Sequence, residues 1–155
     1  MAAGSNDKIV KVVDLDAPVS RVWTALTDHV EFGTWFRVAL DQRFEAGKKS
    51  TGRMTFPGHE NVTWAATIDR METERLFSFR WCDDGSAEDR GNQAEILTEF
   101  HLDKTPEGTR LTITESGFAA LPEHRRDELL QSCRNGWDMQ VENLAAYLRF
   151  KNPQL

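Results

Sequence analysis

The stretch "SCRNGWDMQVENLAAYLRF" (residues 132–150) indicates a long amphipathic helix at the C-terminal end of the chain. Its apolar residues recur every three or four positions, as one face of an α-helix requires. The predicted apolar stripe consists of Leu130, Cys133, Trp137, Val141, Leu144 and Leu148. Because Pro122 suits a first helical turn, we predict a helix over residues 122–150, about 40 Å long. A stripe of that length needs an equally long apolar surface to cover it.

Gly136 interrupts this predicted helix. A glycine inside a helix costs about 1 kcal/mol relative to alanine. With a turn of about 100° per residue, Gly136 falls on the flank of the stripe, together with Gln140 and Tyr147. Two interpretations follow from the sequence. The glycine allows another backbone segment to approach closely, or it leaves space on one side of an internal cavity.

Upstream of this helix, the hydrophobic pattern changes to a period of two, which indicates β-strands. The predicted strands cover residues 8–16, 38–46, 50–56, 62–71, 76–82, 95–103 and 109–116. The breaks between the later strands read "AGKK", "PGHEN", "ETER", "DDGSAEDRGN" and "TPEG". In the last break, Pro106 presets φ and Gly108 is expected to supply a positive φ. Consecutive strands with short turns predict an antiparallel meander.

Two short helices are predicted between the first strand and the meander. Pro18 suits the first helical position of one, and Asp28 can begin the other. In the second helix, Phe32, Trp35 and Phe36 share a face. The predicted fold is therefore α+β, with a curved antiparallel sheet that grips the long C-terminal helix. We expect one domain over residues 1–155, with its core at about 8–150.

The composition narrows the possible partners. The net charge is −6 and no run of Lys or Arg offsets it, so neither nucleic acid nor an anionic membrane is an expected partner. No stretch approaches the ~20 apolar residues of a membrane span, and no secretory signal is visible. Cys82 and Cys133 are the only cysteines. A reduced, cytoplasmic chain is expected, with a structural disulfide as the alternative.

Strand alternation predicts which side chains face the C-terminal helix. The predicted inner sets are Trp64, Ala66 and Ile68; Phe77, Phe79 and Trp81; Ile96, Thr98, Phe100 and Leu102; and Leu111, Ile113 and Glu115. A carboxyl group facing an apolar interior has a raised pKa. Glu115 is therefore either a polar anchor or general acid/base in a pocket, or a strand-end carboxylate that reaches solvent or bonds a loop.

Five segments in order resemble one known family. They are "DAPVSRVWTALTD" (16–28), "WF" (35–36), "LFSFRW" (76–81), "EGTRLTITESGF" (107–118) and "NGWDMQVENLAAYL" (135–148). Together they resemble the activator of heat-shock-protein-90 ATPase homologue family, a branch of the START-like (SRPBCC) helix-grip superfamily. The resemblance implies a cavity between sheet and helix. The superfamily includes lipid carriers and polyketide cyclases, whereas the family's namesake is a two-domain co-chaperone of which this chain resembles the C-terminal part.

We expect a binding protein for an apolar or aromatic small molecule. The predicted ligand-binding residues are Trp35, Phe36, Met54, Phe56, Trp64, Phe79, Trp81, Phe100, Glu115, Gly136, Trp137 and Gln140. Trp35 and Phe36 are expected to close one end of the cavity. No phosphate-binding, nucleophile or metal-ligand motif is present, so neither a metal nor another cofactor is expected. The alternatives are a cyclase or hydrolase that uses Glu115 with pocket water, and a stress-response module that binds a chaperone, which only the resemblance implies.

Overall fold

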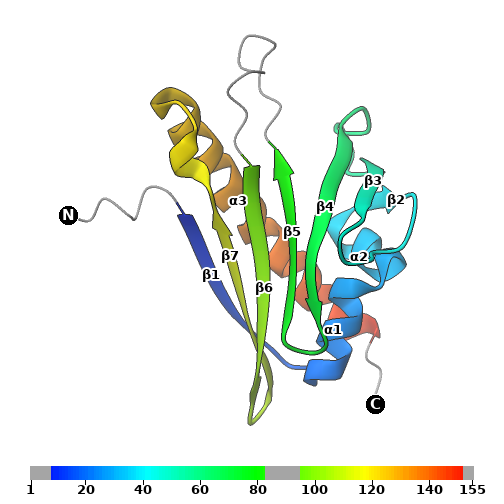
Figure 1. Ribbon diagram of the computed structural model, residues 1–155. Helices are drawn as coiled ribbons and strands as arrows, with labels where there is room; N and C mark the ends of the chain where they lie inside the picture. Colours follow the sequence, from blue (N-terminus) through cyan, green and yellow to red (C-terminus); the bar gives the residue numbers. More distant parts are fainter. Residues whose placement is uncertain (1–7, 83–94, 152–155) are drawn as a thin grey trace, which may run out of the picture.

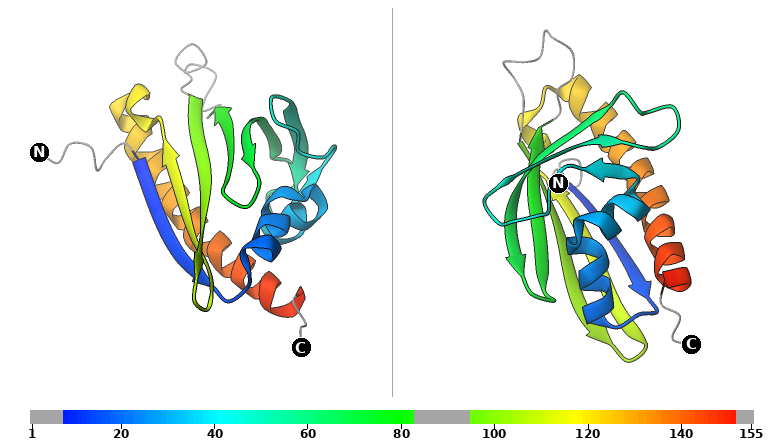
Figure 2. Two further views of the ribbon diagram at one scale, coloured as in Figure 1. Left: turned by 60° about the horizontal axis from the view of Figure 1, so that its bottom comes forward. Right: turned by 90° about the vertical axis from the view of Figure 1, so that its right-hand side faces the viewer.

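The protein folds into a curved antiparallel sheet that packs against one long helix (Figures 1 and 2). The structure is a computed structural model and describes residues 8–82 and 95–151. Its elements are β1 (Lys8–Leu15), α1 (Val19–Thr27), α2 (His29–Phe36), β2 (Val38–Leu40), β3 (Lys49–Met54), β4 (Thr63–Glu72), β5 (Leu76–Cys82), β6 (Glu95–Thr105), β7 (Gly108–Ser116), a 3-10 turn η3 (Phe118–Ala120) and α3 (Glu123–Lys151). The predicted α+β architecture is confirmed. The break expected at "DDGSAEDRGN" lies outside the described residues.

The sheet has seven strands in the order β1-β7-β6-β5-β4-β3-β2, and all neighbours are antiparallel. Strands β2 to β7 form the predicted meander. Helices α1 and α2 carry the chain from β1, at one edge, to β2, at the other (Figure 1). The first strand therefore pairs with the last, from Lys8 opposite Ser116 to Leu15 opposite Thr109.

The long helix α3 buries the predicted stripe against the sheet. Leu130, Trp137, Val141, Leu144 and Leu148 are at most 8% exposed. The predicted inner face of the sheet is also confirmed, because β4, β5, β6 and β7 each present the expected alternate side chains to the core. Each large apolar side chain buried in this way contributes about 1.5–3 kcal/mol. None of the described helices is long and apolar enough to span a bilayer.

The start of α1 differs from the prediction. Pro18 is the N-cap rather than the first helical residue, since its backbone is extended (φ −67°, ψ 157°). Its carbonyl oxygen accepts the first helical hydrogen bonds, from the amides of Arg21 and Val22. Asp28 caps α2 as expected, and its carboxylate accepts from the amides of Val30 and Glu31.

The strand predicted over residues 38–46 is too long. Strand β2 ends at Leu40, and the chain then leaves the sheet. Phe44 turns back into the core, where its ring lies 5.4 Å from that of Phe32 and 5.1 Å from that of Phe77. Burial of this aromatic ring takes precedence over the local alternation.

The hairpin between β6 and β7 forms as predicted, with Thr105 opposite Gly108. The expected positive φ at Gly108 is wrong. A Cβ at this position would lie 2.2 Å from the carbonyl oxygen of Leu15. Gly108 is therefore required by the close approach of the β1–α1 connection rather than by its own backbone angle.

Candidate functional site

Strands β4 and β5 separate at one end, where residues 63–66 of β4 and residues 81–82 of β5 do not pair with each other. Their pairing begins at Thr67 opposite Arg80, and a register shift follows between Ile68 and Arg70. Such a shift marks a β-bulge, which bends the strand that carries it. Within the described chain, the first residues of β4 pair with β3 alone and the last residues of β5 pair with β6 alone. The two strands diverge toward this end (Figure 1), and residues of this unpaired region, called here the opening in the sheet, line the cavity described next.

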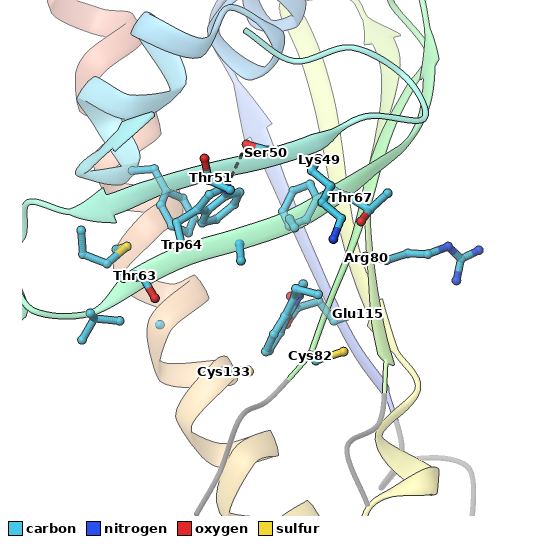
Figure 3. A pocket seen from close by; sticks show the side chains of 18 of the residues that line it. Lys49, Ser50, Thr51, Thr63, Trp64, Thr67, Arg80, Cys82, Glu115 and Cys133 are labelled. Atoms are coloured by element: carbon cyan, nitrogen blue, oxygen red, sulfur yellow. Dashed lines mark hydrogen bonds between the residues drawn. The ribbon is translucent and has the colours of Figure 1, made fainter. Parts of the chain in front are cut away.

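A cavity of about 640 Å³ occupies this region between the sheet and α3. Its lining residues are Phe36, Lys49, Ser50, Thr51, Met54, Val62, Thr63, Trp64, Ala65, Ala66, Thr67, Phe79, Arg80, Trp81, Cys82, Glu95, Glu115, Cys133, Gly136, Trp137 and Gln140. They include residues of the inner face of the sheet, such as Trp64, and residues of its outer face, such as Arg80. Figure 3 shows the Arg80 side chain pointing away from α3. The cavity therefore reaches solvent through the opening in the sheet. Its volume suits a small-molecule site.

Aromatic rings form the walls of the cavity. Phe36 lies 5.5 Å from Trp64 and 6.0 Å from Trp137, and Trp64 lies 5.3 Å from Phe79, measured between ring centroids. The indole N–H of Trp64 donates to the buried hydroxyl of Ser50 at 2.9 Å (Figure 3). Because this polar group is already satisfied, the Trp64 ring is free to offer apolar surface to a ligand.

Helix α3 contributes the other wall, with Gly136 at its centre. Apart from α3 itself, no atom of residues 8–82 and 95–151 lies within 4 Å of the place that a Gly136 Cβ would occupy. Of the two interpretations drawn from the sequence, the structure supports open space in a cavity. The structure contradicts the other interpretation, in which another backbone segment approaches Gly136 closely.

Gln140 lies one turn further along α3, and its side chain also makes hydrogen bonds to α2 and within α3. Its amide nitrogen donates to the carbonyl oxygen of Phe36 at 3.0 Å. Its oxygen accepts from the side-chain amide of Asn143 at 3.1 Å. Gln140 thus holds the end of α2 against α3 and keeps the Phe36 ring at the cavity wall.

Glu115 is buried in the cavity, with 2% of its surface exposed. The Thr98 hydroxyl donates to Glu115 Oε2 at 2.5 Å, and the Trp81 indole N–H donates to Thr98 Oγ1 at 2.9 Å. Glu115 Oε1 has no hydrogen bond to any described residue. The alternative of a solvated strand-end carboxylate is therefore wrong.

Burial raises the pKa of the Glu115 carboxyl above its ordinary value, because the charged form loses its hydration. The Thr98 hydroxyl, the indoles of Trp137 and Trp81, and the Cys133 thiol each oppose this rise in pKa. Desolvation outweighs them. The neutral carboxylic acid is therefore favoured over a wider pH range than for an exposed glutamate.

The raised pKa predicts how stability depends on pH. The folded state holds the Glu115 proton more tightly than the unfolded state does. The contribution of Glu115 to the free energy of unfolding is therefore complete at a pH below the pKa of Glu115 in the unfolded state. It is lost as pH rises through the pKa of Glu115 in the folded state. We expect Glu115→Gln, which carries no charge at any pH, to become progressively more stable than the wild type as pH rises above the ordinary pKa of a glutamate, about 4. Urea unfolding across this range measures the difference. Glu142→Gln, on the exposed face of α3, is the control for the substitution itself. A constant difference for Glu115→Gln would contradict the prediction.

The structure brings nine of the twelve predicted ligand-binding residues to the cavity and leaves three outside its lining. Trp35 is buried, and its indole N–H donates to the carbonyl oxygen of Ala25 at 2.9 Å. Phe100 is fully buried behind the rings of the wall. Phe56 packs near the surface against Arg37 and His59. Of the two residues expected to close one end of the cavity, Phe36 lines it and Trp35 does not.

Sequence reasoning missed most of the β3 and β4 residues around the opening. Their positions depend on the separation of β4 from β5, which leaves no local pattern. One signal was available, because two small residues, Ala65 and Ala66, follow Trp64 in a strand of otherwise larger side chains. Cys133, expected in the core, lines the cavity close to Glu115.

No group of three or more His, Cys, Asp or Glu in the described part of the chain is arranged to hold a metal ion. The chemistry of the site is therefore built from aromatic surface, one buried carboxyl group and its hydrogen-bond chain. This arrangement suits the enclosure of an apolar molecule that carries a polar group.

A curved sheet, a long helix across it and a cavity between them define a helix-grip protein of the α+β class. The sequence model of one family, "Activator of Hsp90 ATPase homolog 1-like protein", matches residues 16–149, and the chain belongs to this family. The resemblance seen in the sequence is thereby confirmed. No curated protein sequence matches the chain.

Solved structures share this fold. Protein MLL2253 from Mesorhizobium loti has a TM-score of 0.76 and 22% identity, over 93% of this chain and 98% of its own. Protein SSP2350 from Staphylococcus saprophyticus has a TM-score of 0.67 and 24% identity, over 92% and 91%. DynU16, described as a putative protein in the dynemicin biosynthetic locus, has a TM-score of 0.72 and 26% identity, over 92% of this chain. The match spans 47% of DynU16, about half of that chain.

Proposed function

We propose that the protein binds an apolar or aromatic small molecule in the cavity between β4, β5 and α3. The observation that carries the proposal is the wall of aromatic rings around about 640 Å³ of space. Gly136 adds to it, since a side chain at this position would point into open space. Gly136 destabilises the helix, and a ligand that occupies the space beside it would explain why a glycine is present at this position.

Two further considerations favour binding over the alternatives. DynU16 belongs to a biosynthetic locus, which supports a small molecule as ligand. In the described chain, the Cys133 thiol is the one other titratable group that affects Glu115, whereas general acid/base catalysis commonly uses a pair of such groups. A chaperone partner rests on the description of the family, while the cavity is a feature of this chain.

Naphthalene is a suitable probe for this proposal. We expect one molecule to bind saturably, with a dissociation constant on the order of 10–100 μM for a ligand of this size. The indole N–H signals of the tryptophans, followed by NMR, report where it binds. Those of Trp64, Trp81 and Trp137 should shift, because these residues line the cavity.

Trp23 and Trp35 are internal controls in the same spectrum, since neither lines the cavity. Equal shifts for all five indoles would indicate a non-specific solvent effect. Absence of saturable shifts up to the solubility limit of naphthalene would contradict the proposal.

A further inference from the structure

The hydrogen-bond chain at Glu115 has a fixed direction. The Trp81 indole N–H can only donate, and it does so to Thr98 Oγ1. Thr98 is fully buried, and Glu115 Oε2 is the one acceptor that its hydroxyl reaches among the described residues. In this arrangement the Thr98 hydroxyl donates its proton to Glu115 Oε2, at 2.5 Å.

This direction decides which oxygen of a neutral Glu115 carries the proton. A carboxylic acid has one O–H and one carbonyl oxygen. Because Oε2 accepts from Thr98, the acid proton resides on Oε1. That oxygen is buried and makes no hydrogen bond of ordinary length to a described residue, while the Trp137 indole and the Cys133 thiol lie close enough to the carboxyl to affect its pKa. A buried donor without an acceptor is unfavourable, and a ligand atom that accepts from it removes the penalty.

The surroundings of Glu115 favour its neutral form. Ile9 of β1 and Thr98 of β6 flank it in the sheet, and the Trp81 side chain of β5 lies beyond Thr98. From α3, Trp137 and Cys133 face it, and of these groups only the Cys133 thiol titrates. The charged residues of the cavity, Lys49, Arg80 and Glu95, lie on the outer face of the sheet by strand alternation.

We propose that Glu115 acts as a hydrogen-bond donor in the cavity, and that the ligand is a neutral, flat, apolar molecule with an acceptor such as a carbonyl oxygen that receives the Oε1 proton. The aromatic walls would hold the body of the molecule, and Glu115 would select the polar end. This inference rests on the proposed function and adds the chemical class of the ligand.

Three probes with one aromatic body separate the possibilities. Naphthalene has the body alone, 2-acetonaphthone adds a carbonyl acceptor, and 2-naphthylmethylamine adds a cation. In the wild type at about pH 5, we expect the ketone to bind about 5- to 10-fold more tightly than naphthalene, as one hydrogen bond to a buried donor provides. This preference should decline as pH rises through the pKa of Glu115, because the ionised carboxylate cannot donate.

Two variants identify the donor. Glu115→Met keeps the bulk of the side chain and removes both polar atoms, so it should bind naphthalene but lose the preference for the ketone. In Glu115→Gln, the amide oxygen can accept from Thr98 while the amide nitrogen donates into the cavity. The preference should therefore persist in Glu115→Gln and become independent of pH. Cooperative unfolding of each variant verifies its fold, and the wild-type pH series requires no substitution.

The outcomes distinguish this inference from the proposed function. If naphthalene does not bind the wild type, the proposed function itself fails. If naphthalene binds but the ketone has the same preference in the wild type and in Glu115→Met, the inference is wrong and the binding proposal stands. Tighter binding of the amine than of the ketone would also overturn the inference, because Glu115 would then act as an anion.

Discussion

Replacing Gly136 with leucine should abolish naphthalene binding, with a loss of affinity of about 100-fold or more, without destabilising the protein. Among the residues that the structure describes, none outside the helix has an atom within 4 Å of the added Cβ, so the side chain enters the cavity rather than a packed wall. Leucine there would fill space that the ligand needs. It also removes the helix penalty of glycine, worth up to about 1 kcal/mol. Unfolding in urea and titration with naphthalene measure the two effects separately.

Gly136→Ala is the matched control for this substitution. It supplies the same gain in helix propensity with a single methyl group, so it should stabilise by up to about 1 kcal/mol and retain most of the affinity. A destabilised Gly136→Leu would mean that the site is packed. Full binding by Gly136→Leu would mean that the ligand occupies another part of the protein.

Replacing Phe100 with alanine should lower the free energy of unfolding by about 3–5 kcal/mol, the range found for large aromatic residues in packed cores. Phe100 is fully buried. Its ring stacks on Phe77 at 5.9 Å and meets the edge of Trp137 at 5.7 Å. The lost ring leaves a cavity that these rigid neighbours cannot fill.

Phe56→Ala is the control, because Phe56 is the same residue type near the surface. We expect a cost of about 1 kcal/mol or less there, as for most substitutions away from the core. Urea unfolding of both variants tests the contrast. Similar costs at the two positions would contradict the assignment of Phe100 to the core and of Phe56 to the periphery.

The candidate site was predictable from the sequence in part. Trp64, Phe79, Trp81 and Glu115 were predicted to face inward, and they do, because alternate side chains on a strand point to opposite faces. Phe100 has the same phase but lies behind the cavity wall. The alternation along a strand determines which face of the sheet a side chain lies on. It does not determine whether the side chain reaches the cavity, because that depends on which other side chains pack in front of it.

The two layers of this protein and the surfaces that they share follow from local patterns in the chain. The stripe on α3 and the alternation along the strands are local properties, set by 3.6 residues per helical turn and two per strand repeat. Folding sets where the cavity opens, why Gly136 is tolerated and which oxygen of Glu115 has no hydrogen bond to a described residue. These features arise from the separation of β4 from β5, the distance from α3 to the sheet and the contact of Thr98 with Glu115 across 17 residues of chain. Each of these three features depends on segments that come into contact only when the chain folds. A local pattern of side chains therefore cannot predict them.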